Sequence, residues 1–224
     1  MSGEELPESL RTEIQGTLVP VRALGPPSRR VLALLPLGVL IAVGVPLVWG
    51  LRLDAPVLGL GRLFGGSALE IAVALFVLAA ALSEAVPARR KTPLALVLPV
   101  GLGLGLVVAL TLLTFKVSAT VAPPKLRGAF LRICFSRSFG IGVIPLAAGW
   151  FLLRRGLVTR PVLAGALAGI GAGLLADSGW RLFCDVSDPI HVLTAHGGAI
   201  LALGALSALL GAVLARVPPS AGTP

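Results

Sequence analysis

Four side chains in the second half of this sequence can do chemistry: Cys134, Cys184, His191 and His196. They are all of the chain's cysteines and histidines. A pair of thiols can form a disulfide, react with an oxidant or bind a soft metal. The two cysteines lie fifty positions apart, and the chain has no Cys-x-x-Cys pair or other metal-ligand spacing. The residues alone leave open a structural disulfide, two inert buried thiols, and a redox or metal sensor.

The spacing of the two histidines argues against a shared metal ion. His191 and His196 are five residues apart, which separates them by about 140° around a regular α-helix. Helices that bind one ion through two histidines place them at i and i+4. We therefore expect no metal and no other cofactor, haem included. A polar role at the start of a helix is the simplest one for both histidines, and titration in a pH or ligand response is the alternative.

No set of catalytic residues is evident. Ser67 follows two glycines but lacks the Gly-x-Ser-x-Gly pattern that exposes a serine nucleophile. Its general base would have to come from a histidine more than a hundred positions away. The chain is therefore not expected to be an enzyme.

Other ionisable residues accompany the cysteines within apolar stretches. Asp177, Arg181 and Cys184 fall at i, i+4 and i+7, which places them on one face of a helix. Asp177 is expected to pair with Arg181, and Glu70 with Arg137 where their helices touch. Charges at membrane depth are usually paired or functional. The simpler interpretation is that these residues form ion pairs whose charged groups extend toward the membrane–water interface. The alternative is that they have a function.

The elements that position these residues are membrane spans. The chain has 224 residues, of which 56% are apolar and only 13% charged, and its mean hydropathy is +0.96. Soluble domains carry roughly a quarter of their residues as charged groups, and a helix needs about 20 apolar residues to cross a bilayer. The predicted fold class is all-α, a polytopic membrane protein with six transmembrane helices. These are Val31–Leu51, Phe64–Leu82, Thr92–Phe115, Ile133–Leu153, Pro161–Phe183 and Ile190–Ala215.

The distribution of basic residues predicts an orientation. With both termini in the cytoplasm, eleven Lys and Arg residues lie on the inner side and eight on the outer side. The cysteines, the histidines and the charged residues of the spans then all fall in the outer third of the bundle. The net charge of +9 is explained by these loops, and no nucleic-acid-binding motif accompanies it.

Glycines recur at positions that let helices approach closely. Gly165, Gly169 and Gly173 follow a small-xxx-small pattern, and Gly101, Gly103 and Gly105 lie together in the third span. Small residues of this kind let helix backbones pack where burial of apolar groups gives no net drive. These glycines are expected to form helix–helix contacts and not a nucleotide-binding loop.

Residues 1–30 are predicted to be a cytoplasmic leader that binds a partner protein. Residues 31–215 form the bundle, and 216–224 a short cytoplasmic tail. Four apolar residues of the leader repeat every four positions, and prolines then extend the chain toward the first span. An apolar stripe flanked by glutamates suits a groove on a protein better than an anionic membrane surface. The residues expected to bind are Leu6, Leu10, Ile14, Leu18, Pro20, Val21 and Arg22.

Several of these features, taken in order, resemble the NrsF-like family of six-span bacterial anti-sigma factors, over essentially the whole chain. They are the Pro-Val-Arg-x-Leu-x-Pro-Pro-x-Arg-Arg run of residues 20–30, Cys134 at the start of the fourth span, the Gly-rich residues 160–169, and Cys184 followed by Asp185, Asp188-Pro189, His191 and His196. CarR-like inhibitors of the light-responsive carotenoid sigma factors share this architecture.

The resemblance implies a non-enzymatic negative regulator in the inner membrane. Its leader and cytoplasmic loops would hold an extracytoplasmic-function sigma factor away from RNA polymerase. Cys134 and Cys184 would take part in relieving inhibition after an oxidative, light-generated or other envelope stress signal. The chain lacks the His-x3-Cys-x2-Cys motif of soluble zinc-type anti-sigma domains, so zinc-dependent release is not expected.

A small membrane transporter or channel is the alternative function. Transporters place polar groups and broken helices near the middle of the bilayer. The middles of the predicted spans are mostly Leu, Val, Ala and Gly, although Pro36, Pro46, Pro99 and Pro145 are able to interrupt helices. The sequence therefore favours a regulator over a transporter.

Overall fold

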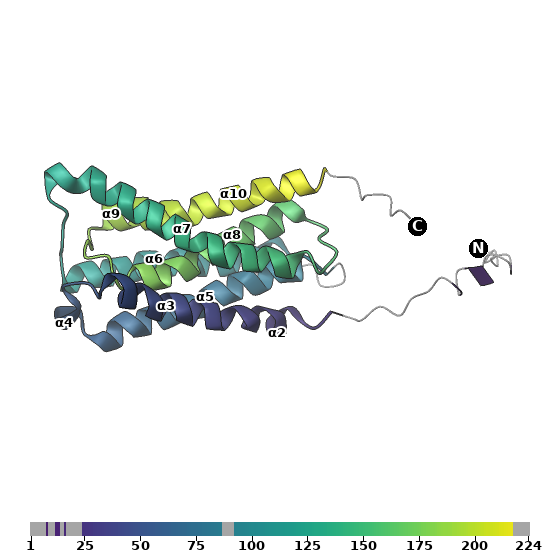
Figure 1. The fold of residues 1–224 in the computed structure, drawn as a ribbon, viewed down its shortest axis with the longest axis horizontal. Coiled ribbons are helices and arrows are strands. Elements are labelled where there is room, and N and C mark those ends of the chain that lie inside the picture. Colours follow the sequence, from purple (N-terminus) through teal and green to yellow (C-terminus); the bar gives the residue numbers. More distant parts are fainter. Residues whose placement is uncertain (1–7, 9–11, 14–15, 17–23, 87–91, 217–224) are drawn as a thin grey trace.

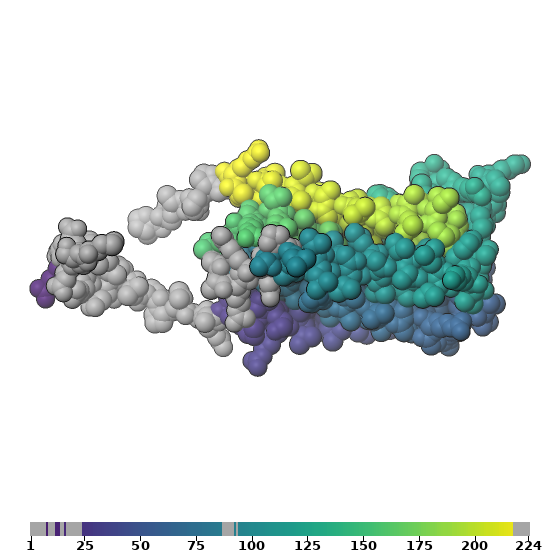
Figure 2. All heavy atoms as spheres, turned by 180° about the vertical axis from the view of Figure 1, so that it is seen from behind, coloured from purple at the N-terminus to yellow at the C-terminus, as the bar shows by residue number. Residues whose placement is uncertain are grey.

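The computed structural model describes residue 8, residues 12–13, residue 16, and residues 24–86 and 92–216. Within these ranges the regular structure is helical, so the all-α prediction is confirmed. The helices lie side by side in an elongated bundle, seen from opposite sides in Figures 1 and 2. The leader residues predicted to bind a partner (Leu6, Leu10, Ile14, Leu18, Pro20, Val21 and Arg22) lie outside the described residues.

Six helical segments are long and apolar enough to cross a membrane, as the sequence predicted. The first combines α2 (Pro27–Val31), the 3-10 turn η1 (Leu32–Leu34) and α3 (Leu35–Trp49), and the second and third are α5 (Leu60–Ser83) and α6 (Pro93–Val117). The fourth combines the 3-10 turn η3 (Pro124–Leu126) with α7 (Arg127–Leu153), and the fifth is α8 (Pro161–Trp180). The sixth combines α9 (Pro189–Val192), η4 (Leu193–Gly197) and α10 (Gly198–Leu214). The fourth helical segment starts at Pro124 and not at the predicted Ile133, because the more polar residues between these positions belong to the same segment.

Helix α8 is the central element of the bundle. Fifteen of its twenty residues are buried, and it packs against α3, α5, α7 and α10. Small residues make this possible, because alanine and glycine alternate along much of the helix and let four neighbours approach. Any side chain at the carboxyl end of α8 is therefore surrounded by other helices.

The close contact between α8 and α10 confirms the predicted role of the α8 glycines. A Cβ atom on Gly169 would lie 2.6 Å from the carbonyl carbon of Leu203, and one on Gly173 would lie 2.7 Å from the Cα of Ile200. The third-span prediction is only partly correct. Gly103 lies against Leu174, whereas Gly101 and Gly105 have open space where a Cβ would be.

The two ends of the bundle differ. The first span begins and the last span finishes at one end, called here the terminal end (Figure 1). The opposite end carries three connections, residues 50–59, 118–123 and 181–188, and is called the cysteine end. The first of these connections contains the short helix α4 (Ala55–Leu58).

Candidate functional site

The connection that carries Cys184 is held in place by hydrogen bonds to the 118–123 connection. The Thr120 N–H donates to Ser187 Oγ at 2.9 Å, and the Ser187 N–H donates to the Thr120 carbonyl at 3.0 Å. The Thr120 hydroxyl donates to the carbonyl of Asp185, and the Ser187 hydroxyl to that of Ser118. Partly buried backbone groups are thereby satisfied without secondary structure, which fixes the path of the chain next to Cys184.

The 50–59 connection holds the same segment from another side. The Arg52 N–H donates to the carbonyl of Leu182 at 2.9 Å, and the Leu53 N–H donates to the Asp185 carboxylate at 2.5 Å. The Arg52 side chain pairs with Asp54 at 2.5 Å. Burial raises the pKa of Asp54, but hydrogen bonds from Arg52 and Ser118 outweigh it and hold this pKa below its ordinary value. The 50–59 and 118–123 connections are thus both hydrogen-bonded to the 181–188 connection, and the three together are called here the cap of the cysteine end.

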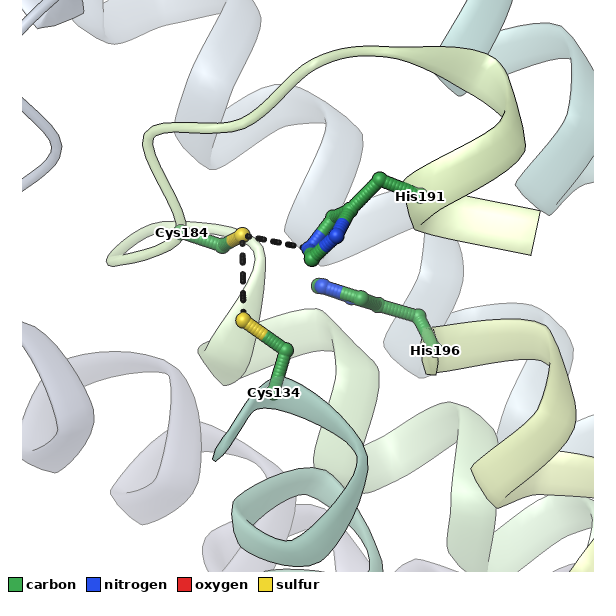
Figure 3. A group of neighbouring side chains, drawn as sticks. All are labelled: Cys134, Cys184, His191 and His196. Atoms are coloured by element: carbon green, nitrogen blue, oxygen red, sulfur yellow. Dashed lines mark hydrogen bonds between the residues drawn. The ribbon is translucent and has the colours of Figure 1, made fainter. Parts of the chain in front are cut away.

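Beneath this cap the two cysteines face each other. Cys134, near the start of α7, and Cys184, after the end of α8, are both free thiols, and their Sγ atoms lie 3.6 Å apart. Figure 3 shows both side chains directed toward the same point as the rings of His191 and His196. Cys184 Sγ lies 3.7 Å from His191 Nε2. All four side chains are at least nine-tenths buried.

The two histidines meet because the helix between them is not regular. Residues Leu193–Gly197 form a π-helical turn, in which the hydrogen bonds run from i to i+5. Residues five apart are thereby brought together, and the ring centroids of His191 and His196 lie 6.0 Å apart. The separation of about 140° predicted from a regular helix is therefore wrong. One ligand atom from each of the four residues lies within 4.8 Å of the others, as in a metal site.

His196 is oriented by a buried carboxylate. Its Nδ1 lies 2.5 Å from Asp177 Oδ1, and both side chains are at most 1% exposed. The carboxylate accepts a hydrogen bond from Nδ1–H, and in the neutral form of the ring the lone pair is then on Nε2. This Nε2 atom is buried and has no hydrogen-bond partner among the described residues. Figure 3 shows the ring directed into the group of four.

The buried charges form one network at the same end. Arg181 Nε lies 3.1 Å from Glu70 Oε2 and 3.5 Å from Asp177 Oδ2. The predicted pair of Asp177 with Arg181 is confirmed. The predicted pair of Glu70 with Arg137 is wrong, because Arg181, directly after the end of α8, reaches Glu70 instead. The Arg137 guanidinium instead lies over the ring of Trp49, at 5.9 Å from the ring centroid.

The structure brings together residues that the sequence indicated only as separate candidates. Cys134, Cys184, His191 and His196 were all recognised as candidates, and the structure brings all four together. The histidine–carboxylate contact was missed, because Asp177 was assigned only to Arg181. The π-helical turn was not predicted either, because no local pattern in the sequence indicates it.

A six-span, all-α membrane protein with a buried thiol–imidazole cluster at one end is the class defined by the fold and the site. Comparison with known families matches residues 16–216 to NrsF, negative regulator of sigma F. The chain belongs to this family, so it is a regulatory protein of the anti-sigma class and not a member of an enzyme family. No curated protein and no solved structure matches the chain.

Proposed function

We propose that this protein sequesters an extracytoplasmic-function sigma factor at the bacterial inner membrane and releases it when the chemistry of Cys134 and Cys184 changes. The observation that carries the proposal is the family match, which extends over all six spans. The name of the family specifies negative regulation of a sigma factor. The class of sigma factor and the signal are the finer part of the proposal.

The leader is the proposed contact surface for the sigma factor. Its apolar residues Leu6, Leu10, Ile14 and Leu18 repeat along one helical face, and Pro20, Val21 and Arg22 continue toward the first span. A helix that presents an apolar stripe to a groove on a partner is a common mode of recognition. Both termini are proposed to be cytoplasmic, on the balance of basic residues.

The separation of the two ends supports a signalling role. The cluster of cysteines and histidines lies at the cysteine end, and the leader joins the first span at the terminal end. Helix α8 connects the two ends and packs tightly on four other helices. A change at Cys184 is therefore proposed to reach the cytoplasmic surface through α8 and its neighbours. Light-generated or other oxidants are the proposed class of signal, and carotenoid genes are one proposed target.

Co-purification tests the proposal directly. The full-length protein, tagged at its carboxyl terminus and solubilised from its own cells, is expected to carry a sigma factor identified by mass spectrometry. A variant lacking residues 2–25, which keeps the first span from Pro27 onward, is expected to insert into the membrane but to lose that sigma factor. A folded full-length protein that captures no sigma factor would overturn the proposal. Capture by both forms would overturn the role of the leader.

A further inference from the structure

The cluster at the cysteine end has the composition of a tetrahedral metal site. Cys134 and Cys184 offer two sulfur ligands, and His191 and His196 offer two imidazole nitrogens. Two sulfurs and two nitrogens in tetrahedral geometry are typical of a structural zinc site. The ligands come from two spans and one connection, so such an ion would join the fourth span, the sixth span and the connection that follows the fifth at one point.

The distances favour a metal over a disulfide. Two sulfurs bound to tetrahedral zinc at about 2.3 Å lie about 3.8 Å apart, and a sulfur and a nitrogen lie about 3.6 Å apart. The observed distances are 3.6 Å between the two Sγ atoms and 3.7 Å between Cys184 Sγ and His191 Nε2. The two sulfurs of a disulfide lie about 2.05 Å apart. The other pairs of ligand atoms, all within 4.8 Å of each other, have to move closer together when the ion binds.

A second observation points independently to a ligand. His196 Nε2 is buried, directed into the cluster and without a hydrogen-bond partner among the residues described. A buried polar atom of this kind costs free energy unless something binds it. Its other ring nitrogen contacts Asp177, which reproduces the carboxylate–histidine–metal arrangement that orients ligands in known zinc sites. Arg181 in turn holds Asp177.

Charge and access fit the same ion. A divalent zinc with two thiolates and two neutral imidazoles has no net charge, which suits a buried position. Binding replaces the two thiol protons, which leave as H⁺ when both Zn–S bonds form. A pocket lined partly by Leu63, Thr111 and Arg181 also reaches Cys184 and His196. This pocket borders the cluster on the side of α5 and α6.

We propose that Cys134, Cys184, His191 and His196 form a zinc-binding site that joins the fourth and sixth spans to the 181–188 connection at the cysteine end. This ligand set differs from the His-x3-Cys-x2-Cys motif that the sequence lacks, and it departs from the expectation that the chain binds no metal. The proposal rests on the described side chains and does not depend on sigma-factor binding.

Metal titration of the full-length protein in detergent tests the site. The reduced protein, stripped with a chelator, is titrated with Co²⁺, which reports thiolate ligation through charge-transfer absorption and tetrahedral geometry through strong visible bands. One Co²⁺ per chain with both signatures is expected, and one equivalent of Zn²⁺ should abolish them. Elemental analysis should find one zinc per chain after reconstitution. A reduced, helical wild-type protein without charge transfer, or with the weak bands of octahedral Co²⁺, would overturn the proposal.

Matched variants assign the ligands. Cys134→Ser and His191→Gln should each weaken Co²⁺ binding at least tenfold and alter the spectrum. Ser138→Ala, one turn away on α7 and equally buried, should bind as the wild type does. Asp177→Asn should keep the spectrum but weaken affinity by about 10–100-fold. Helical circular dichroism identifies any variant that does not fold. Wild-type affinity in folded Cys134→Ser and His191→Gln would refute the assignment.

Discussion

The two halves of α8 are built on different principles. Its first half, through Gly173, contacts α10 through glycines whose missing side chains let two backbones meet. Its last turns carry Asp177 and lead to Arg181, which join a charged network and a thiol–imidazole cluster. The packing of the first half depends on the small volume of its glycines. The packing of the second half depends on the pairing of buried polar groups. The two halves thus stabilise the bundle in different ways, and only the second carries groups that can do chemistry.

Removing the positive charge from the polar half should have the largest effect. Arg181→Met leaves Glu70 and Asp177, both fully buried, without their cation. Breaking a buried ion pair from one side costs about 3–5 kcal/mol. The thermal unfolding midpoint in detergent is expected to fall sharply, and Glu70→Gln in the same chain should restore part of it.

Arg137→Met is the matched control for this experiment. The Arg137 side chain lies over Trp49 and not at Glu70, so its loss should cost about 1 kcal/mol or less. If Arg137→Met were as damaging as Arg181→Met, and were rescued by Glu70→Gln, the network described above would be incorrect.

Filling the glycine contact should have the next largest effect. In Gly169→Ala the new methyl group meets only backbone atoms, including the Cα of Gly204 at 2.7 Å. Because a backbone cannot rotate away as a side chain does, we expect a loss of about 1–3 kcal/mol. Gly105→Ala has open space and should be neutral or stabilising by up to about 1 kcal/mol. Equal unfolding midpoints for the two variants would contradict the packing of α8 on α10.

The smallest effect is expected at the cap of the cysteine end. The pKa of Asp54 is lower in the folded protein than its ordinary value, so its ionised form adds stability above the unfolded pKa of about 3.9. That contribution is lost as the pH falls through the folded pKa. Asp54→Asn should lose about 1 kcal/mol at neutral pH. The difference from wild type should vanish in acid, and a difference that grows on acidification would contradict this account.

The sequence predicted those features that depend on local pattern. Hydropathy defines the spans because each must satisfy its own backbone in lipid, and the spacing of Gly165, Gly169 and Gly173 reports a helix face. The Asp177–Arg181 pair is also local, at i and i+4. These predictions were correct because the residues of each lie within a few positions of one another along the chain.

The rest of the site depends on which helices are neighbours. The partner of Glu70 was mispredicted because its contact with Arg181 joins two segments that are far apart along the chain. The meeting of His191 with His196 depends on a π-helical turn, and the contact of His196 with Asp177 joins two spans. Such contacts arise from tertiary packing, so the sequence identified the four cluster residues individually but not the site that they form.

The central claim is that the cluster faces the exterior while the leader and the terminal end face the cytoplasm. Two exposed leucines allow a direct measurement, since Leu53 is 86% exposed at the cysteine end and Leu157 is 72% exposed at the terminal end. Each is replaced by cysteine in separate chains, and cells with a permeabilised outer membrane are treated with a membrane-impermeant maleimide. The wild type is the control, because Cys134 and Cys184 are buried. Labelling of Leu53→Cys but not Leu157→Cys is expected, and the reverse pattern would contradict the proposed orientation and with it the account of signalling across the membrane.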